Sequence, residues 1–315
     1  MRVVVAGGGG FIGSHLVDQL VARGDEVTVL DAFSTGRRSN LSGQLGSEYC
    51  EVIECDITKP LPEVGDVEAV VNLASPACPD DFESMALEIL GAGSVGNRRL
   101  LDLATAHGAR FLLASTSEVY GASLMHPQYE DYWGNVDPIG PRSCYDEAKR
   151  FAEATTVAYA RTHRLDIRIA RIFNTYGERM APTDGRVVAA FVARALRDEP
   201  LLVYGDGTQT RSFCHVSDQV AGLIALLDGS CGLPVNIGNP EEVTIMELAE
   251  LVISIVRPSS EISVVPLPER RTGDPDRRCP DISRARSELG WEPQIALSDG
   301  VAAMASYFRD HEELG

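Results

Sequence analysis

Four consecutive glycines near the start of the chain constrain its fold more than any other feature. The valines of residues 3–5 predict a buried strand, which leads into Gly7-Gly8-Gly9-Gly10-Phe11-Ile12-Gly13. Residues 14–20 then predict a helix, and residues 26–30 predict a second strand that ends at Asp31. This order of strand, loop, helix and strand predicts a dinucleotide site, because the glycines at 7, 10 and 13 let the backbone approach a pyrophosphate.

The same segment indicates which dinucleotide is bound. We expect Phe11 and Ile12 to line the cofactor site where the helix N-terminus presents free N–H groups to the phosphates. We expect Asp31 to accept hydrogen bonds from the adenosine ribose, which favours NAD because the 2′-phosphate of NADP would meet a carboxylate. Arg37 and Arg38 lie close enough in the sequence to keep NADP open.

Asp56 and Ile57 follow the expected strand 50–54 and are candidate adenine contacts. The residue type alone does not decide this point, because an aspartate after a strand also serves as an ordinary cap of the strand end.

A tyrosine and a lysine four residues apart are the main catalytic candidates. The chain has 28 lysine and arginine residues, of which only Lys59 and Lys149 are lysine. Lys149 follows Tyr145 by four positions, a spacing that places both on one face of a helix. An ammonium beside a phenol favours the phenolate, so we expect Lys149 to lower the pKa of Tyr145 and make it a base. Two surface residues on an amphipathic helix would give the same spacing.

Composition limits the classes of function. The net charge of −18 argues against nucleic acid as a partner, and no apolar run is long enough for a membrane span. Seven cysteines form no CxxC pair and no histidine pair has ligand spacing, so we expect reduced thiols and no metal. The first strand begins at residue 3, so we expect no leader peptide and a cytoplasmic location.

Strand-like and helix-like segments alternate through most of the chain. Apolar strand patterns recur at 69–73, 111–114, 167–172 and 235–237, with helical patterns such as 144–161 and 187–197 between them. This alternation predicts an α/β fold with a doubly wound parallel sheet. We expect residues 1–175 plus about 213–240 to form the NAD-binding domain. A smaller interleaved domain, residues 176–212 plus about 241–315, would bind the substrate.

Hydroxyl and acidic side chains follow the strand at 111–114. Thr116, Ser117 and Glu118 therefore lie at the carboxyl end of a strand of a doubly wound sheet, where ligands bind. A simple strand-end cap is the alternative. Many arginines occur in the second half of the chain, and a few that converge could bind a diphosphate and a carboxylate despite the negative net charge.

Several motifs together resemble the extended short-chain dehydrogenase/reductase family, which includes NAD-dependent epimerases and dehydratases. The resemblance spans essentially the whole chain. It rests on Gly7-x-x-Gly10-x-x-Gly13, Asn72-Leu73-Ala74-Ser75-Pro76, Thr116-Ser117-Glu118-Val119-Tyr120-Gly121, Tyr145-x-x-x-Lys149 and Arg171-Ile172-Phe173-Asn174-Thr175-Tyr176-Gly177. It implies tightly bound NAD with Ala74 at the cofactor, and a homodimer formed through the helices that flank the site.

Within this family the chain looks most like the branch that decarboxylates UDP-glucuronate. The segments that carry this likeness are residues 126–128, 130–142, 184–188 and 209–213. Related 4,6-dehydratases have an Asp-Glu pair after the threonine, whereas this chain has Ser117-Glu118. A serine cannot protonate a departing hydroxyl at neutral pH, and a decarboxylation has no hydroxyl to expel.

The resemblance implies oxidation at C4 of UDP- or dTDP-glucuronate, loss of carbon dioxide from the resulting β-keto acid, and re-reduction at C4. Tyr145 would be the base, with Thr116 relaying or orienting the proton. Ser117, Glu118 and Arg211 would handle the carboxylate and the reprotonation at C5. The residues expected to bind the sugar nucleotide are Asn174, Arg186, Tyr204, Arg211 and Arg278.

Three alternatives remain open on the sequence: a 4-epimerase of the same fold, a 4,6-dehydratase, and a non-catalytic sugar-nucleotide binding protein. The chain also departs from the family at two positions. Gly93 stands where asparagine is usual, within a stretch that forms helix poorly, and Asn72 stands where histidine is common. We expect a bend or looser packing near the nicotinamide around Gly93.

Overall fold

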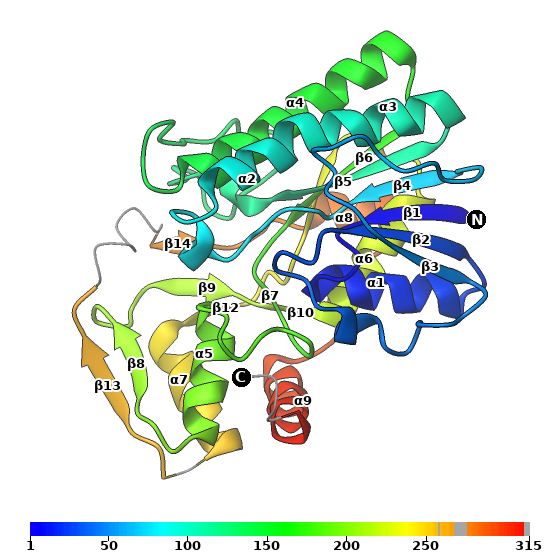
Figure 1. Cartoon of the computed structure of the whole chain (residues 1–315). Coiled ribbons are helices and arrows are strands. Elements are labelled where there is room, and N and C mark those ends of the chain that lie inside the picture. The colour runs from blue at the N-terminus through cyan, green and yellow to red at the C-terminus, as the bar shows by residue number, and fades with distance from the viewer. Residues whose placement is uncertain (258, 268–275, 312–315) are drawn as a thin grey trace.

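The computed structural model describes residues 1–257, 259–267 and 276–311. Its largest sheet has seven parallel strands in the order β11–β6–β5–β4–β1–β2–β3 (Figure 1). The strands are β1 Arg2–Ala6, β2 Glu26–Asp31, β3 Cys50–Glu54, β4 Ala69–Asn72, β5 Arg110–Thr116, β6 Ile167–Ile172 and β11 Pro234–Ile237. Each was expected from the sequence, and the prediction of a doubly wound parallel sheet is confirmed.

The strand order creates a crevice at one place in the sheet. The chain runs outward from β1 to β3, returns to pair β4 with β1, and then runs outward in the other direction. The connections that follow β1 and β4 therefore diverge at this switch point, where doubly wound sheets bind ligands. The glycine loop follows β1, and Thr116 ends β5, the strand next to β4.

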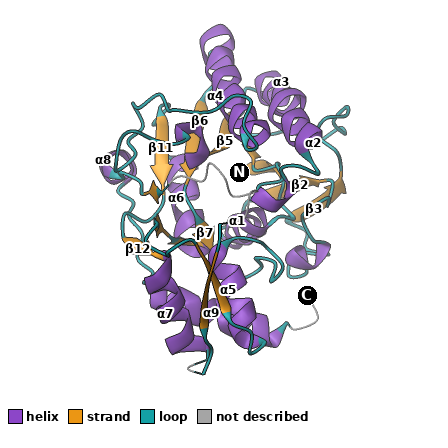
Figure 2. Cartoon of the chain, turned by 90° about the vertical axis from the view of Figure 1, so that its left-hand side faces the viewer, coloured by secondary structure: helices purple, strands orange, loops and turns teal. Residues whose placement is uncertain are grey.

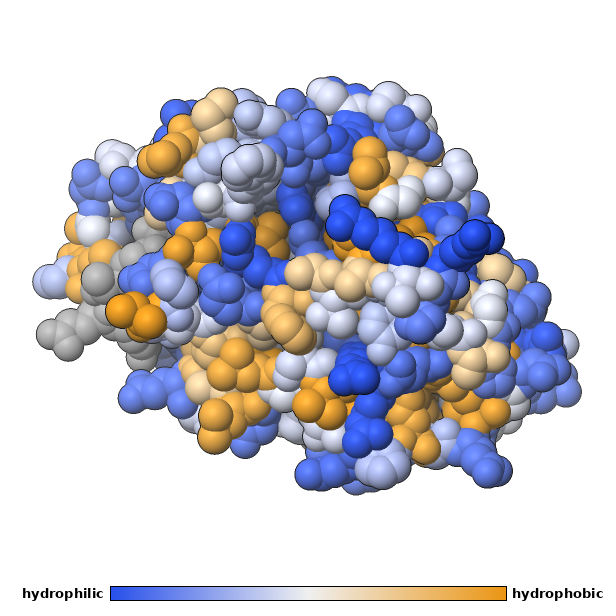
Figure 3. Space-filling view, turned by 90° about the horizontal axis from the view of Figure 1, so that it is seen from above, coloured by the Kyte–Doolittle hydropathy of each residue, from blue (hydrophilic) through white to orange (hydrophobic). Residues whose placement is uncertain are grey.

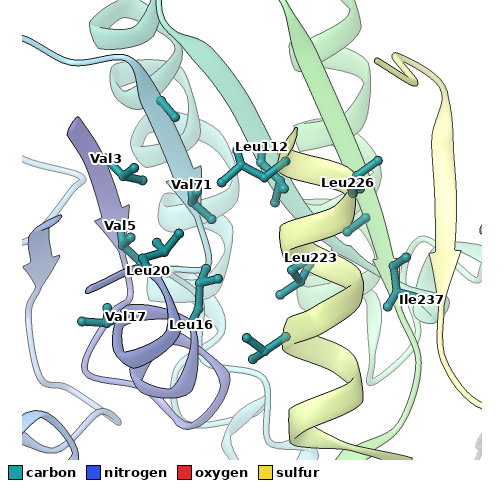
Figure 4. Close-up of a cluster of buried hydrophobic side chains, with 14 of the residues drawn as sticks. Val3, Val5, Leu16, Val17, Leu20, Val71, Leu112, Leu223, Leu226 and Ile237 are labelled. Carbon is teal, nitrogen blue, oxygen red and sulfur yellow. The ribbon is translucent and has the colours of Figure 1, made fainter. Parts of the chain in front are cut away.

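Helices cover both faces of the sheet because successive residues of each strand point to opposite sides. Val3 and Val5 of β1 point toward Leu16 and Leu20 of α1 and toward Leu223 of α6 (Figure 4). These helices span Phe11–Ala22 (α1) and Val216–Asp228 (α6). All five residues are at most 2% exposed, so this side of the sheet forms one continuous core.

The alternate residues of β1 pack on the other face. Val4 and Ala6 belong to a core with Leu100 and Leu101 of α3, and Ala152 of α4 completes this layer. The helices of this side are α2 Ala86–Gly91, α3 Asn97–His107 and α4 Ser143–His163. α3 ends at Gly108, whose φ of +61° is readily adopted by glycine.

A second, smaller region lies at the carboxyl ends of the strands (Figures 1 and 2). Its strands form three small sheets: β7 Thr175–Tyr176 with β10 Cys214–His215, β8 Leu201–Tyr204 with β13 Ile262–Val265, and β9 Thr210–Ser212 with β12 Glu242–Thr244 and β14 Arg277–Arg278. Its helices are α5 Val187–Leu196, α7 Ile245–Val256 and α9 Leu297–Asp310, which pack together around a separate apolar core.

The chain returns to the large sheet before α9. Ala285 of α8 (Ser283–Leu289) and Trp291 pack in the same core as α1 and α6. The indole N–H of Trp291 donates a hydrogen bond to the carbonyl of Asp218 at 3.1 Å. Among the described residues, no helix has the length and apolar character needed to cross a lipid bilayer.

Candidate active site

A deep cleft separates the sheet from the smaller region. It has a volume of about 1380 Å³ and is lined by residues from both. This exceeds the roughly 300–1,000 Å³ typical of a site for one small ligand. The lining includes all the predicted catalytic and substrate-binding residues: Thr116, Ser117, Glu118, Tyr145, Lys149, Asn174, Arg186, Tyr204, Arg211 and Arg278. The fold therefore brings together segments that lie far apart in the sequence.

The glycine loop forms one end of this cleft. Gly7 has a φ of +81°, and a Cβ there would lie 2.7 Å from the backbone nitrogen of Ala74. A Cβ on Gly13 would lie 2.1 Å from the carbonyl oxygen of Gly7, so only glycine fits at either position. α1 begins directly after the loop, with Gly10 at its N-cap and no side-chain hydrogen bond to its first turn. This bare backbone at a helix N-terminus fits the pyrophosphate of a dinucleotide.

The predicted cofactor residues separate into two groups. Gly7, Gly10, Phe11, Ile12 and Gly13 line the cleft, as do Tyr145 and Lys149. The cleft-lining residues do not include Asp31, Asp56, Ile57 or Ala74.

The carboxylate of Asp31 instead stabilises the glycine loop. It accepts hydrogen bonds from the backbone nitrogens of Gly9 at 2.8 Å and Phe33 at 2.7 Å. Asp56 accepts hydrogen bonds from the backbone nitrogen and hydroxyl of Thr58, as a strand-end cap does, and Ile57 packs in the core. Roles of Asp31, Asp56, Ile57 and Ala74 at the cofactor stay predictions.

Tyr145 and Lys149 occupy the first two turns of α4 and face the end of β5. The phenol of Tyr145 is hydrogen-bonded to the side chain of Thr116, and its ring stacks on Phe82 with centroids 5.0 Å apart. The ammonium of Lys149 lies 5.7 Å from the centre of the Tyr145 ring and donates a hydrogen bond to the carbonyl of Ala114 at 2.8 Å. Tyr145 and Lys149 are each 7% exposed to solvent.

The expected phenolate does not arise from these protein groups. Burial raises the pKa of Tyr145 to about 12, although its hydrogen bond with Thr116 acts in the opposite direction. Burial also lowers the pKa of Lys149 to about 8. The prediction that Lys149 makes Tyr145 a base was therefore wrong for the protein alone, because the sequence showed the spacing and not the burial that disfavours both charged forms.

Glu118 forms the centre of a charged cluster beside Tyr145. Its Oε2 lies 2.9 Å from a guanidinium nitrogen of Arg142 and 3.1 Å from one of Arg278. Burial alone would raise the pKa of Glu118, but the arginines, with a contribution from Arg211, outweigh burial and hold it below its ordinary value. Arg278 also donates a hydrogen bond to the hydroxyl of Ser117 at 3.1 Å. Glu118 is therefore a carboxylate at neutral pH.

The smaller region carries the predicted substrate residues Arg186, Tyr204, Arg211 and Arg278. Arg186 forms an ion pair with Asp184 at 2.7 Å, and its guanidinium lies 5.9 Å from the ring centre of Phe11. Its charge acts on Tyr145, so it lies close to the proposed base. Arg211 of β9 pairs with Arg278 of β14 in the strand register. This pairing places both guanidinium-bearing residues on adjacent strands beside Glu118.

The chain around Gly93 widens into a π-helical turn and packs tightly. Residues Ala92–Gly96 form a π-helical turn between α2 and α3. A Cβ on Gly93 would lie 2.8 Å from both the Cβ and the carbonyl oxygen of Ala148, next to Lys149. Asn72 and Asn97 pair close by, with the amide nitrogen of Asn72 donating to Asn97 at 3.0 Å. The expectation of looser packing is therefore wrong, since the missing side chain permits close contact with α4.

Sequence reasoning missed three residues of the site. Arg142 forms an ion pair with Glu118, and Phe82 stacks on Tyr145. Asp146 follows Tyr145 in the sequence and is buried, and the charges of Glu118 and Arg142 act on it. Arg142 and Asp146 flank Tyr145 in the sequence, and this proximity was the one signal available. Phe82 lies in an irregular segment that no motif singled out.

A glycine loop and a tyrosine–lysine pair that share one cleft define a dinucleotide-binding α/β protein with room for a second ligand. Residues 3–238 match the model of the NAD dependent epimerase/dehydratase family. The chain belongs to this family, and NAD is its cofactor, as the sequence predicted.

The comparisons with individual proteins agree. The chain is 51% identical over 309 residues to a protein named UDP-glucuronic acid decarboxylase 4 of Arabidopsis thaliana, covering 98% of this chain and 69% of that protein. It superimposes on the UDP-glucose 4-epimerase of Thermotoga maritima with a TM-score of 0.90, at 28% identity and with 99% and 100% of the two chains covered. The dTDP-glucose 4,6-dehydratase of Streptomyces venezuelae, solved with NAD, gives a TM-score of 0.89 at 30% identity over both whole chains.

Proposed function

We propose that the protein is a UDP-glucuronate decarboxylase that forms the UDP-xylose type of product through a 4-keto intermediate. The observation that carries this proposal is the cluster of Arg142, Arg278 and Glu118 beside Tyr145. An acidic sugar requires cations next to the reacting carbons, and two arginines are already held there. The names of the 51% identical relative and of several others at similar identity support the same substrate.

Each group has a defined task in this reaction. Tyr145, hydrogen-bonded to Thr116, lies where it can take the proton from the C4 hydroxyl and later return one to the C4 oxygen. Bound NAD would supply the hydride acceptor for C4 and a positive charge that lowers the pKa of Tyr145. Lys149, fixed to the carbonyl of Ala114, orients the cofactor side of the site.

The carboxylate chemistry falls to the arginine cluster. We assign Arg278 and Arg211 to the C6 carboxylate of the sugar, which is lost as carbon dioxide when the electrons of the breaking C–C bond enter the C4 ketone. Ser117 accepts a hydrogen bond from Arg278 and thereby orients it. Because Ser117 is not an acid, the site offers no proton donor at the position that a 4,6-dehydratase requires, which argues against that alternative.

Mass spectrometry of the nucleotide products tests this function. Incubation of the protein and NAD with UDP-glucuronate should yield a nucleotide lighter by one carbon dioxide. A product of unchanged mass but altered chromatographic retention would indicate a 4-epimerase instead. Unreacted UDP-glucuronate would exclude the proposal, and dTDP-glucuronate and nucleotide-glucoses would then be tested. We expect both uridine and thymidine nucleotides to fit, since the two bases share most contacts.

We further propose that the two regions divide the ligands between them. Residues 1–175 plus about 213–240 would bind NAD, and 176–212 plus about 241–315 would bind the sugar nucleotide through Arg186, Tyr204, Arg211 and Arg278. Asn174, at the end of the first region, would also contact the sugar nucleotide. The separate core around α5, α7 and α9 supports this division. Within the predicted range 241–315, residues 258, 268–275 and 312–315 lie outside the described residues.

We also propose a homodimer, formed through α2 and α4. Leu87 and Leu90 of α2 are 80% and 40% exposed, and Phe151 of α4 is 54% exposed. Figure 3 looks onto this side of the molecule, where hydrophobic residues interrupt a mostly hydrophilic surface. Light scattering of Leu87→Lys should show a monomer if this surface forms the dimer. A cytoplasmic location is proposed as well, supported by the free thiols of all seven cysteines.

A further inference from the structure

Asp146 is a buried acid next to Tyr145 that the mechanism above does not use. It lies in the first turn of α4 and is 5% exposed. Its Oδ1 is enclosed and accepts no hydrogen bond from the described part of the chain. An enclosed carboxylate oxygen without a donor is unfavourable when charged, whereas a neutral carboxylic acid tolerates the same surroundings far better. The geometry therefore favours the protonated form.

The charges around Asp146 come from three elements. Glu118 acts on it from the turn after β5, Arg278 from β14, Glu147 from α4 itself and Arg142 from the N-cap of α4. Burial, followed by the like charge of Glu118, raises the pKa of Asp146 to about 7, while the two arginines act in the opposite direction. Glu118, which touches both arginines, is the acid that ionises first. Asp146 is therefore the one that holds a proton.

We propose that Asp146 is a positioning residue that holds this proton so that the arginine cluster keeps its positive charge for the carboxylate of the substrate. Arg142, Arg211 and Arg278 all act on the carboxylate of Glu118, and Asp146 adds no further negative charge beside them while it stays neutral. An ionised Asp146 would cancel one more of these charges. The protonation of Asp146 thus sets the preference of the cleft for an acidic sugar nucleotide, an inference that rests on the proposed function.

This arrangement couples substrate binding to proton uptake. The carboxylate of bound UDP-glucuronate adds a negative charge to the cluster and raises the pKa of Asp146 further. At a pH equal to its pKa half of the Asp146 side chains carry a proton, so binding near pH 7 should take up as much as about half a proton per site. UDP-xylose lacks the carboxylate and should cause little uptake, which makes the difference between the two ligands diagnostic.

Calorimetry in buffers of different ionisation enthalpy measures this uptake. The protein, with NAD present, carries Tyr145→Phe so that UDP-glucuronate binds without reacting. We expect uptake with UDP-glucuronate to exceed that with UDP-xylose. The difference should disappear when Asp146→Asn is added. Glu147→Gln alters the neighbouring and more exposed acid, which acts on Asp146 less strongly than Glu118 and the two arginines do. It is the matched control and should leave most of the difference in place. The titration of Lys149, whose pKa is about 8, affects both ligands and is removed by the subtraction.

Steady-state kinetics with enzyme that retains Tyr145 give a second readout. Between pH 7 and 9 the KM for UDP-glucuronate should rise several-fold as Asp146 ionises, and this rise should be absent in Asp146→Asn, with a smaller effect on kcat. Asp146→Ala serves as a second neutral variant if the asparagine does not fold. Equal proton uptake for the two ligands, or a difference that survives in the neutral variants, would overturn the inference. If the unmodified enzyme releases no carbon dioxide from UDP-glucuronate, the proposed function fails instead.

Discussion

Replacement of Lys149 by methionine should abolish turnover and yet stabilise the fold at neutral pH. Burial lowers the pKa of this lysine from 10.5 to about 8. At 1.36 kcal/mol for each pH unit, the buried ammonium destabilises the folded state by about 3 kcal/mol. Methionine has a similar length, carries no charge, and removes this penalty. It also removes the hydrogen bond to the carbonyl of Ala114, a loss of about 1–2 kcal/mol. Lys149→Met should therefore gain about 1–2 kcal/mol at pH 7.

The pH dependence of the stability gain shows whether it comes from removing the buried ammonium. The folded-state pKa of Lys149 lies below its unfolded value, so the penalty is fully present below pH 8 and is lost as the pH rises toward 10.5. By pH 9.5 roughly 1.4 kcal/mol of it remains, which is about equal to the hydrogen bond that the variant lacks. The stability advantage of Lys149→Met should therefore shrink to near zero at this pH.

Urea unfolding at pH 7 and pH 9.5, at one fixed NAD concentration, gives the free energy of unfolding at each pH by linear extrapolation. The only other lysine of the chain provides the control, because Lys59 is exposed and Lys59→Met should change stability by less than about 0.5 kcal/mol at either pH. A variant at Lys149 that is less stable than the wild type at pH 7, or that shows the same difference at both pH values, would refute the reasoning.

Three further changes test the site and its support. Glu118→Gln adds a net positive charge to the arginine cluster, so initial-rate measurements should show a lower KM for UDP-glucuronate together with at least about a tenfold lower kcat; an unchanged kcat would contradict the assigned role. Gly93→Ala places a Cβ 2.8 Å from Ala148 and should reduce the free energy of unfolding by about 1–3 kcal/mol in urea titrations, whereas Gly43→Ala, with open space around it, should not. Thr244→Ala removes the capping box of α7 and should lower stability by about 1 kcal/mol by the same measurement, leaving activity unchanged.

Local sequence patterns were enough to predict the seven strands of the large sheet and the catalytic and substrate residues that line the cleft. The glycine loop, Thr116 and the Tyr145–Lys149 pair each follow from the position of a strand end or the spacing of a helix. The pKa of Tyr145 did not follow, because it depends on how completely Phe82 and the end of β5 enclose the phenol. Phe82 lies more than 60 residues before Tyr145 in the sequence, and no local pattern connects them.

The tight packing at Gly93 was missed for a related reason. Glycine in a helical segment normally signals weak helix formation, and this principle predicts loose packing. Here the absent Cβ admits the backbone of α4, so the tertiary contact with Ala148 decides the outcome. Asp146 went unnoticed because an aspartate in the first turn of a helix is usually a favourable surface charge. Only the fold shows that Glu118 and the arginines surround it.

The contrast between one buried lysine and many arginines follows from what each cation must do. The pKa values of Arg171 and Arg186 are raised, because their carboxylate partners Glu153 and Asp184 outweigh the burial that acts against the charge. Guanidinium groups thus stay charged in these surroundings and can hold an anion at any physiological pH. Lys149 has no carboxylate among the causes that shift its pKa, and burial alone brings that pKa near neutrality. An ammonium that can lose its proton beside Tyr145 is suited to respond to the charge of the cofactor, whereas a guanidinium there would not respond at all.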